Sequence, residues 1–320
     1  MDELRPLEEW AARELRQAVR DFLTERPGEG WARFAGELGV AGLAIPEEHG
    51  GAGCGFGEVA IVCEEIGRAL APLPYLQTVV AAEAVRAAGK GPDLLEAIAE
   101  GRRTATVVLP GDADLELQSD LLTGVVPYAL DGDLVVVHVD GLLVEAAPTR
   151  RKPYATLDGT RPLAELTFDA VPARRLGPSD GARVRDLAVA LLAAEQAGGA
   201  ARCLESAVAY AKERRQFGRP VGSFQAVKHK LADMLVRVES ARSAARAAAG
   251  HAGDAAYAAL AGSYCTEAYL HVAGENIQIH GGIGVTWEHD AHLYFKRATS
   301  DAQLFGPPER HRARLERLVF

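Results

Sequence analysis

The chain has 320 residues, of which 48% are hydrophobic and 25% are charged, a balance typical of a soluble globular protein with two or three packed units. Its net charge of −9 excludes a general attraction to nucleic acid. No apolar run approaches the roughly 18 residues that span a bilayer, and the acidic residues 1–6 do not resemble a signal peptide. We therefore expect a cytoplasmic protein with no membrane and no nucleic-acid partner.

Residues up to about 100 carry the apolar spacing of helices. One face is formed by Leu15, Val19 and Phe22. Further helices are expected at 31–38, 59–70, 78–88 and 93–100. The glycine-rich segment 50–57 is a loop, which we interpret as a connector; an approach of its backbone to a ligand is the alternative. Together these elements predict an N-terminal helical domain, 1–103.

The period changes near Thr104, where short β-branched segments predict strands. Asp140 and Gly141 form a hairpin signal between two of them. The last strand is expected to end at Pro172, because proline cannot donate to a sheet ladder. The expected strands are 104–109, 134–139, 141–145 and 164–168. They predict a small middle β domain, 104–175.

From Arg183 the helical period returns and continues to the end of the sequence. Gly198 and Gly199 mark close backbone packing or a bend, and Ser223 is the expected N-cap of the second helix. The expected helices are 184–212, 223–249, 255–273 and 290–300, with a short basic piece from 307. Long helices joined by short turns predict a C-terminal four-helix bundle, 176–320. The fold class is therefore α+β and mostly α.

A cluster of cations surrounds the turn between the first two of these helices. The cations are Lys212, Arg214, Arg215 and Arg219, and turn residues interrupt the periodicity at Gly218, Pro220 and Gly222. Cations close to a new helix N-terminus suit an anionic ligand. The ordinary interpretation is a solvated helix end, because most charge runs are solvent-exposed.

Two motifs together resemble the signatures of flavin-dependent acyl-CoA dehydrogenases. The first is Glu-Arg-Arg-Gln-Phe-Gly at 213–218 with Phe-Gln-Ala at 224–226, and the second is Gln-Ile-His-Gly-Gly-Ile-Gly-Val at 278–285, followed by Arg297. A weaker match covers residues 39–53. Both long motifs occur in the order of the family and at about its spacing. The resemblance therefore covers nearly the whole chain.

The resemblance implies α,β-dehydrogenation of an acyl-CoA thioester with FAD as cofactor, in fatty acid or sterol catabolism. It places Arg214 at the FAD pyrophosphate, Phe217 and Gln225 along the dinucleotide, and the middle β domain beside the flavin. It also implies that a neighbouring subunit contributes Gln278, Gly281 and Gly282, so a homo- or hetero-oligomer, dimer or tetramer, is expected. An electron-transfer flavoprotein is the kind of electron acceptor that this family implies.

Each of these residues also has a structural interpretation. Gln278, Gly281 and Gly282 are compatible with a helix cap and turn, His280 with packing or with a position near phosphate, and Trp287 with the core.

The four cysteines are scattered and lack metal-ligand spacing: Cys54, Cys63, Cys203 and Cys265. They predict buried, reduced thiols with no bound metal.

The catalytic base is the point at which the sequence departs from the family. The reaction needs a carboxylate to take the α-proton, a flavin to accept the β-hydride, and hydrogen-bond donors at the thioester oxygen. Most members carry the glutamate after the arginine that Arg297 matches, and Gly306 stands at that position here. Other members place it early in the first long helix, which falls near Ala188. The base is therefore unknown, with Glu195 and Asp301 as candidates.

Three interpretations remain open. The chain is the base-less partner of a short, bacterial-type α2β2 heterotetramer in which the other subunit supplies the base. Alternatively, it is an active homo-oligomer with a displaced carboxylate such as Glu195 or Asp301. The third interpretation is a non-catalytic protein that binds flavin or acyl thioester.

Overall fold

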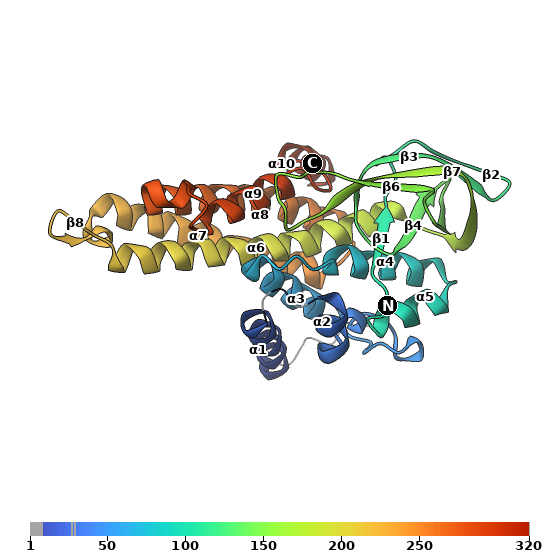
Figure 1. Cartoon of the computed structure of the whole chain (residues 1–320), viewed down its shortest axis with the longest axis horizontal. Helices are drawn as coiled ribbons and strands as arrows, with labels where there is room; N and C mark the ends of the chain where they lie inside the picture. The colour runs from blue at the N-terminus through green and yellow to red at the C-terminus, as the bar shows by residue number, and fades with distance from the viewer. Residues whose placement is uncertain (1–8, 27, 29, 320) are drawn as a thin grey trace. The chain divides into compact units, whose positions relative to one another are not determined.

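The computed structural model describes residues 9–26, 28 and 30–319 (Figure 1). The chain folds into two compact units. The first contains the described residues up to Val62 together with Pro72–Ala188, and the second contains Cys63–Ala71 and the described residues from Val189. The predicted fold class, mostly helical with a small sheet, is confirmed. The finer division into domains 1–103, 104–175 and 176–320 stays a prediction, and residues 1–8 of the expected helical region lie outside the described residues.

Five helices precede the sheet, as the apolar spacing predicts. They are α1 (Glu9–Glu25), α2 (Trp31–Leu38), α3 (Phe56–Ala69), α4 (Tyr75–Ala88) and α5 (Pro92–Ala99). Helix α1 buries Val19 and Phe22 of the expected face. Helix α3 begins three residues earlier than expected, so the glycine-rich loop is shorter. At Gly51 of this loop a Cβ would lie 2.0 Å from the carbonyl oxygen of Ile45, which shows that backbone meets backbone there.

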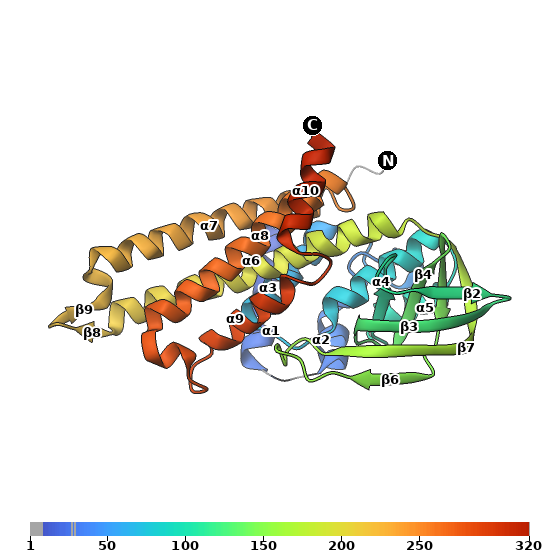
Figure 2. The same cartoon turned by 90° about the horizontal axis from the view of Figure 1, so that it is seen from above.

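The sheet of the first unit has seven strands. They are β1 (Ala105–Val108), β2 (Leu115–Gln118), β3 (Leu121–Leu130), β4 (Leu134–Val139), β5 (Leu142–Ala146), β6 (Arg150–Pro153) and β7 (Leu163–Pro178). The order is β1-β4-β5-β7-β3-β2 with β6 paired to β7, and β3, β7 and β6 lie side by side in Figure 2. Only the β1–β4 pair is parallel among the described strands. Strands β2, β3 and β6 were missing from the sequence prediction. Strand β2 alternates apolar and polar residues over only four positions, and β3 and β6 lack a simple apolar alternation.

The hairpin signal at Asp140 and Gly141 is confirmed. These two residues join β4 to β5, which pair antiparallel with Val139 opposite Leu142. Both have positive φ, 51° and 75°, the combination that a tight two-residue hairpin needs to match the twist of its strands.

Strand β7 is much longer than expected, and the prediction that it ends at Pro172 is wrong. The strand continues to Pro178 because it changes partners at this point. Before Pro172 it pairs with β3 and β6, and from Ala173 it pairs with β5. A residue that cannot donate to the ladder is tolerated where one set of hydrogen bonds gives way to another.

The second unit is built mainly from long helices. They are α6 (Gly181–Glu213, of which the part from Val189 belongs here), α7 (Gln225–Gly250), α8 (Ala255–His280), α9 (Ala291–Asp301) and α10 (Pro308–Val319). Helices α6, α7 and α8 run alongside one another in Figures 1 and 2. One apolar core takes residues from four helices, including Ala207, Met234, Val272 and Ala298. The predicted bundle of helices is confirmed.

The paired glycines of α6 allow close packing and cause no break in the helix. A Cβ at Gly198 would lie 1.8 Å from the carbonyl oxygen of Glu64, and one at Gly199 would lie 2.5 Å from Cζ of Tyr269. Among the described residues, α6 is the one helix that by length and composition alone could cross a membrane. However, 89% of its apolar window is buried inside the protein, as in the core helix of a globular protein.

Two helix boundaries differ from the sequence prediction. Ser223 is not the N-cap of α7; its Oγ donates to the carbonyl oxygen of Pro220 at 2.7 Å, and Phe224 occupies the cap position. Helix α8 continues past Ala273 to His280. A glycine inside a helix costs only about 1 kcal/mol relative to alanine, so the packed helix continues through Gly274.

Candidate functional site

The basic turn folds as a small hairpin between α6 and α7. Its strands are β8 (Arg215–Gln216) and β9 (Arg219–Pro220), which pair antiparallel. The two connecting residues, Phe217 and Gly218, have φ values of 53° and 77°. Positive φ is rare for a bulky side chain, and Phe217 is also 90% exposed. Such backbone strain at an exposed aromatic side chain is characteristic of functional positions.

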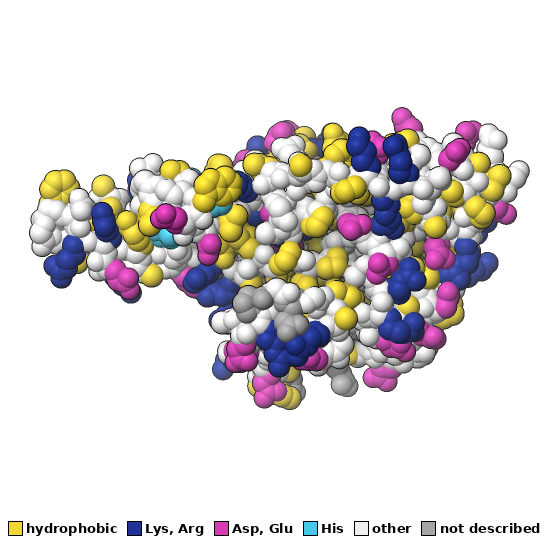
Figure 3. Space-filling view, in the orientation of Figure 1, with side chains coloured by type: hydrophobic (Ala, Val, Ile, Leu, Met, Phe, Trp, Pro, Cys, Tyr) yellow, Lys and Arg dark blue, Asp and Glu magenta, His cyan; other side chains and the backbone are white. Residues whose placement is uncertain are grey.

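The cations of this hairpin are presented to solvent. Arg214, Arg215 and Arg219 are all exposed, and Figure 3 shows Lys and Arg side chains in the region where β8 lies in Figure 1. The guanidinium of Arg219 lies 4.1 Å from the ring centroid of Phe224. Within the described part of the chain, no side-chain partner contacts the guanidinium of Arg214. Its donors are therefore available to an anion.

The second motif lies at the C-terminal end of α8. Gln278 is in the last turn, and Gly281 ends the helix with φ 64°, donating its N–H to the carbonyl oxygens of Gln278 and Ile277. The 3-10 turn η4 (Gly281–Val285) follows. A Cβ added at Gly281 or Gly282 would meet no atom within 4 Å. The backbone of this motif therefore forms a helix end followed by a turn, and there is open space beside Gly281 and Gly282.

The two motif regions meet through a stack of rings. Tyr210 of α6 lies 4.4 Å from His280 of α8, and His280 lies 4.2 Å from His289, centroid to centroid. Nδ1 of His280 donates to the carbonyl oxygen of Asn276 at 2.8 Å. Burial lowers the pKa of His280, aided by nearby His289 and opposed by the Asn276 hydrogen bond. The neutral imidazole is thus the form that packs between the motifs.

Trp287 was expected in the core, and that expectation is wrong. Its side chain is 84% exposed. Nζ of Lys296 lies 4.2 Å from the ring centroid, and the ring contacts His292 edge-on at 5.0 Å. The helical spacing of apolar residues does not extend over this segment, so the sequence offered no evidence of its burial.

Gly306 lies in the turn between α9 and α10 with φ 117°, directly after Phe305, whose φ is 61°. Its carbonyl oxygen accepts a hydrogen bond from Nε2 of His311 at 3.0 Å. A Cβ at Gly306 would lie 3.4 Å from Cδ of Arg310, so space for it exists. Glycine is required here by the backbone conformation rather than by lack of room.

The two carboxylates considered as replacement bases are buried. Glu195 is 3% exposed and forms a buried ion pair with Arg297, the arginine of the family motif. Asp301 is 1% exposed and contributes, after burial and Cys203, to raising the pKa of Tyr269. Asp186 is also buried. Their roles as bases stay predictions. In the structure, the carboxylate of Glu195 pairs with the guanidinium of Arg297 inside the helical core.

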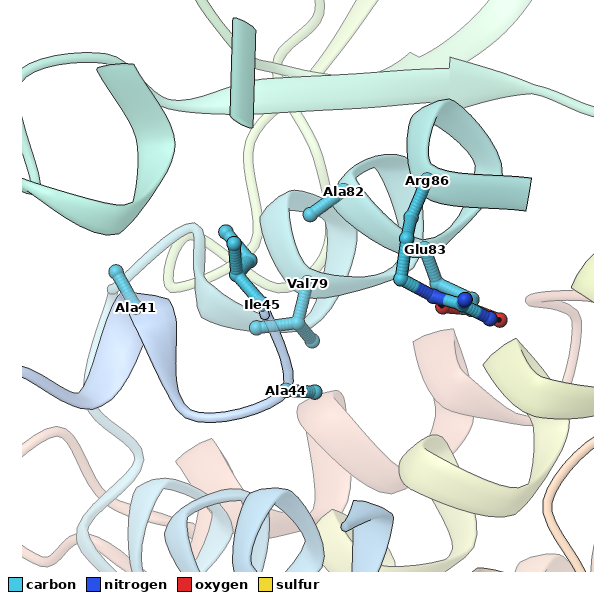
Figure 4. Close-up of a pocket in the computed structure, with 7 residues that line it drawn as sticks. All are labelled: Ala41, Ala44, Ile45, Val79, Ala82, Glu83 and Arg86. Carbon is cyan, nitrogen blue, oxygen red and sulfur yellow. Dashed lines mark hydrogen bonds and ion pairs between the residues drawn. The ribbon is translucent and has the colours of Figure 1, made fainter. Parts of the chain in front are cut away.

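A small pocket in the first unit was missed by sequence reasoning (Figure 4). It lies between α4 and the segment 41–45, within the weaker family motif. Its apolar lining is Ala41, Ala44, Ile45, Val79 and Ala82. Glu83 and Arg86 lie side by side at one end of the labelled group. The signal that could have revealed it is an acidic and a basic residue three positions apart within an otherwise uncharged helix.

No cluster of three His, Cys, Asp or Glu side chains that could hold a metal ion occurs in residues 9–26, 28 and 30–319. Of the cysteines, Cys63, Cys203 and Cys265 are buried and Cys54 is partly exposed; all four are free thiols. Burial as the main cause raises the pKa of Cys265 to about 12. The prediction of buried thiols is therefore right for three of the four.

Solved structures share this arrangement of helices and sheet. The Tcur3481–Tcur3483 steroid ACAD variant matches with a TM-score of 0.87 at 31% identity, over 96% of this chain and 97% of its own. The ChsE4–ChsE5 complex from Mycobacterium tuberculosis matches with a TM-score of 0.85 at 27% identity, over 99% and 98%. The fold is that of acyl-CoA dehydrogenases.

Sequence comparison gives the same result over most of the chain. The pattern of the acyl-CoA dehydrogenase N-terminal domain matches residues 5–91, and that of the C-terminal domain matches residues 188–320. Acyl-CoA dehydrogenase IpdE2 of Mycolicibacterium smegmatis is 41% identical over 91% of this chain and 88% of its own length. This chain belongs to the acyl-CoA dehydrogenase family, whose members are oxidoreductases that act on a CH–CH bond of acyl-CoA and generally use FAD.

Proposed function

We propose that this chain is the base-less subunit of an FAD-dependent acyl-CoA dehydrogenase and that a partner subunit completes the enzyme. The observation that carries the proposal is Gly306. It stands where most members of the family carry the catalytic glutamate, and its φ of 117° is one that L side chains rarely adopt. A side chain at this position would have to strain the turn, so the turn is adapted to the absence of a carboxylate.

The burial of the other candidates supports the same proposal. A general base must come within hydrogen-bond reach of the proton that it removes. Glu195 is 3% exposed and held by Arg297, and Asp301 is 1% exposed. The ion pair makes the Glu195 carboxylate part of the helical core. We therefore expect the base to come from the partner subunit.

The residues at the two motifs fit the phosphates of a dinucleotide. Guanidinium groups such as that of Arg214 bind phosphate through paired N–H donors, and the open space at Gly281 and Gly282 would admit an anion to the backbone. Phe217 and Gln225 would contact the rest of the cofactor. Gln278, Gly281 and Gly282 would reach it from a neighbouring subunit. When bound, FAD supplies the acceptor for the β-hydride. Lys212, Arg215 and Arg219 add positive charge around the same hairpin.

The partner is proposed to be a second, acyl-CoA dehydrogenase-like chain that carries the glutamate. Two similar structures are complexes of two named chains, ChsE4 with ChsE5 and Tcur3481 with Tcur3483, and the second is described as a steroid ACAD. We infer a hetero-oligomer, an acyl-CoA substrate derived from a steroid, and a cytoplasmic location. An electron-transfer flavoprotein remains the proposed electron acceptor.

The test compares the chain expressed alone with the chain co-expressed with a glutamate-bearing dehydrogenase-like partner. We expect weak flavin retention alone, and stoichiometric FAD that bleaches anaerobically with acyl-CoA in the complex. A lone chain that is yellow and bleaches would contradict the base-less assignment and support the homo-oligomer. A complex that holds FAD but never bleaches with any acyl-CoA would favour the non-catalytic binding protein.

A variant of the hairpin tests the cofactor assignment separately. Arg214→Ala should weaken FAD binding by the complex about ten- to a hundredfold, because charge-assisted hydrogen bonds contribute roughly 1.5–3 kcal/mol. Fluorescence titration of the apo-complex with FAD measures this change. The matched control is Arg246→Ala, which removes an exposed arginine from α7 outside the motif. Equal affinities for the two variants would disprove the pyrophosphate assignment.

A further inference from the structure

The segment 281–288, which carries the two glycines of the second motif, has a histidine ring at each end. His280 is the last residue of α8, and His289 lies two residues before the start of α9. Their ring centroids lie 4.2 Å apart with 47° between the ring planes. The ring contact therefore joins the two ends of this segment, which we call the closed loop.

His280 also supports the closed loop from below its glycines. A Cβ at Gly284 would lie 3.0 Å from Cβ of His280 and 2.9 Å from the carbonyl oxygen of Ile277, so turn η4 packs directly on the last turn of α8. Tyr210 of α6 places a second ring 4.4 Å from that of His280. Since His280 is only 4% exposed, its ring is a packed part of the structure that holds the loop.

Backbone groups determine which nitrogen of each ring carries a hydrogen. Nδ1 of His280 lies 2.8 Å from the carbonyl oxygen of Asn276, which only accepts, so this nitrogen is the N–H donor. Nδ1 of His289 accepts from the backbone N–H of Ala291 at 3.1 Å, so this nitrogen has the lone pair. Both contacts are made by neutral imidazoles, and a proton added to His280 has to go to Nε2.

Such a proton would put a positive charge inside the stack. Burial first, and then His289, lowers the pKa of His280 from its ordinary value of 6.5, and the hydrogen bond to Asn276 opposes this shift. The closed loop therefore binds a proton less readily than an open one. Its stability is complete above pH 6.5 and falls as the pH drops below that value.

The charged groups around the stack lie on the side of His289. Glu288 and Asp290 flank His289 in the sequence, and His292 of α9 is within electrostatic reach of His289, Asp290 and Lys296. From α6, the ring that faces His280 is that of Tyr210. Within the described part of the chain, no carboxylate is among the groups that act on His280. A charge on His280 would therefore remain uncompensated.

We propose that His280 and His289, packed on Tyr210, are positioning residues that hold Gly281 and Gly282 in the conformation that receives the FAD phosphates, and that protonation of His280 opens the closed loop and weakens FAD binding. The inference rests on the proposed function, because it needs FAD at these glycines. The three side chains act through the backbone that they support, with no contact of their own to the cofactor.

Fluorescence titration of the FAD-free complex with FAD tests the pH dependence. From about pH 7.5 to about pH 5.5, affinity should fall about tenfold, because a histidine with an ordinary pKa in the open loop is mostly protonated at the lower pH. His280→Phe keeps a ring that cannot take a proton, so its affinity should change less than about twofold over the same range. The control is His271→Phe, which replaces an exposed histidine of α8 outside the motif and should keep the original pH dependence.

Hydrogen exchange of the FAD-free complex reports on the closed loop without the cofactor. After correction for the intrinsic rate at each pH, peptides from 281–288 should exchange several-fold faster at the lower pH in the original complex, and at one rate in His280→Phe. His280→Ala removes the ring and should exchange fast at both pH values. Thermal unfolding shows whether these variants fold. If they do not, His289→Asn carries the test: it keeps an acceptor for the N–H of Ala291, removes the second ring, and should also exchange fast at both pH values.

The outcomes distinguish this inference from the function on which it rests. The same pH dependence of FAD affinity in the original complex and in His280→Phe would overturn the inference alone, as would exchange of 281–288 that does not respond to pH or to loss of a ring. A complex that binds no FAD at any pH would remove the proposed cofactor site, and the role of the closed loop in FAD binding with it.

Discussion

Nε2 of His311 donates a hydrogen bond to the carbonyl oxygen of Gly306 over 3.0 Å. This contact ties the first turns of α10 to the turn that precedes it, and His311 is itself buried. Phe305 and Gly306 both have positive φ in this turn. Residue 306, which we propose stands at the position of the family's catalytic glutamate, is thus part of a backbone arrangement that suits glycine.

The first prediction concerns this turn. Gly306→Ala should lower the free energy of unfolding by roughly 1–3 kcal/mol, because a Cβ strains a backbone at φ 117° although no atom blocks it. Urea denaturation measures the change. Gly274→Ala is the control: it lies inside α8, its Cβ would meet Phe295 at an ordinary 3.7 Å, and it should be neutral or slightly stabilising. No difference between the two variants would show that Gly306 is not needed for the turn.

The second prediction concerns the buried pair of Glu195 and Arg297. Arg297→Met should destabilise the protein by about 3–5 kcal/mol, because it removes the guanidinium from a buried carboxylate. Replacing both residues with methionine should cost much less, since no uncompensated charge remains. Urea denaturation of the single and double variants gives the comparison. A double variant as unstable as the single one would mean that the charges are not the main determinant of stability here.

The third prediction is a pH dependence due to His138. Burial first, and then the charge of Arg185, lowers the pKa of His138 from 6.5 to about 4, against the opposing influence of Asp180 and Asp112. The unfolded chain therefore binds a proton between pH 6.5 and 4 that the folded chain does not, so stability is retained above pH 6.5 and falls as the pH drops toward 4.

His138→Gln should remove this part of the acid sensitivity, giving a flatter dependence of unfolding free energy on pH between 6.5 and 4. Chemical denaturation at several pH values measures the slope. The control is His251→Gln, which replaces an exposed histidine at the end of α7. If both variants keep the slope of the original protein, His138 is not its source.

The fourth prediction concerns the thiols. Burial is the first cause of the raised pKa of Cys203 and of Cys265, so these thiols should hardly ionise near neutral pH. Cys54 is partly exposed and Cys63 is buried. A thiol-reactive dye should therefore label about one site per native chain, and all four in denaturant. Cys54→Ser should abolish the native reaction; rapid labelling of that variant would show that a second thiol is accessible.

Much of the secondary structure follows from local chemistry. The helices of the bundle were predictable because their apolar residues recur on one face, and the Asp140–Gly141 hairpin because few residue pairs adopt positive φ easily. The two family motifs were recognisable because each lies in one continuous stretch of the sequence. Strands β3 and β6 were not, because they are ordered by pairing with β7, and β2 was not, because it is ordered by pairing with β3.

The sequence alone determined the family, the presence of cations and glycines at the two motifs, and the absence of a carboxylate at residue 306. It could not determine which distant side chains meet, because contact depends on how helices pack. Only the tertiary structure brought Tyr210 onto His280 and paired Glu195 with Arg297. It also placed Glu83 and Arg86 beside an apolar pocket. The burial of the Glu195 carboxylate and its pairing with Arg297, which make it part of the core, arise from that packing.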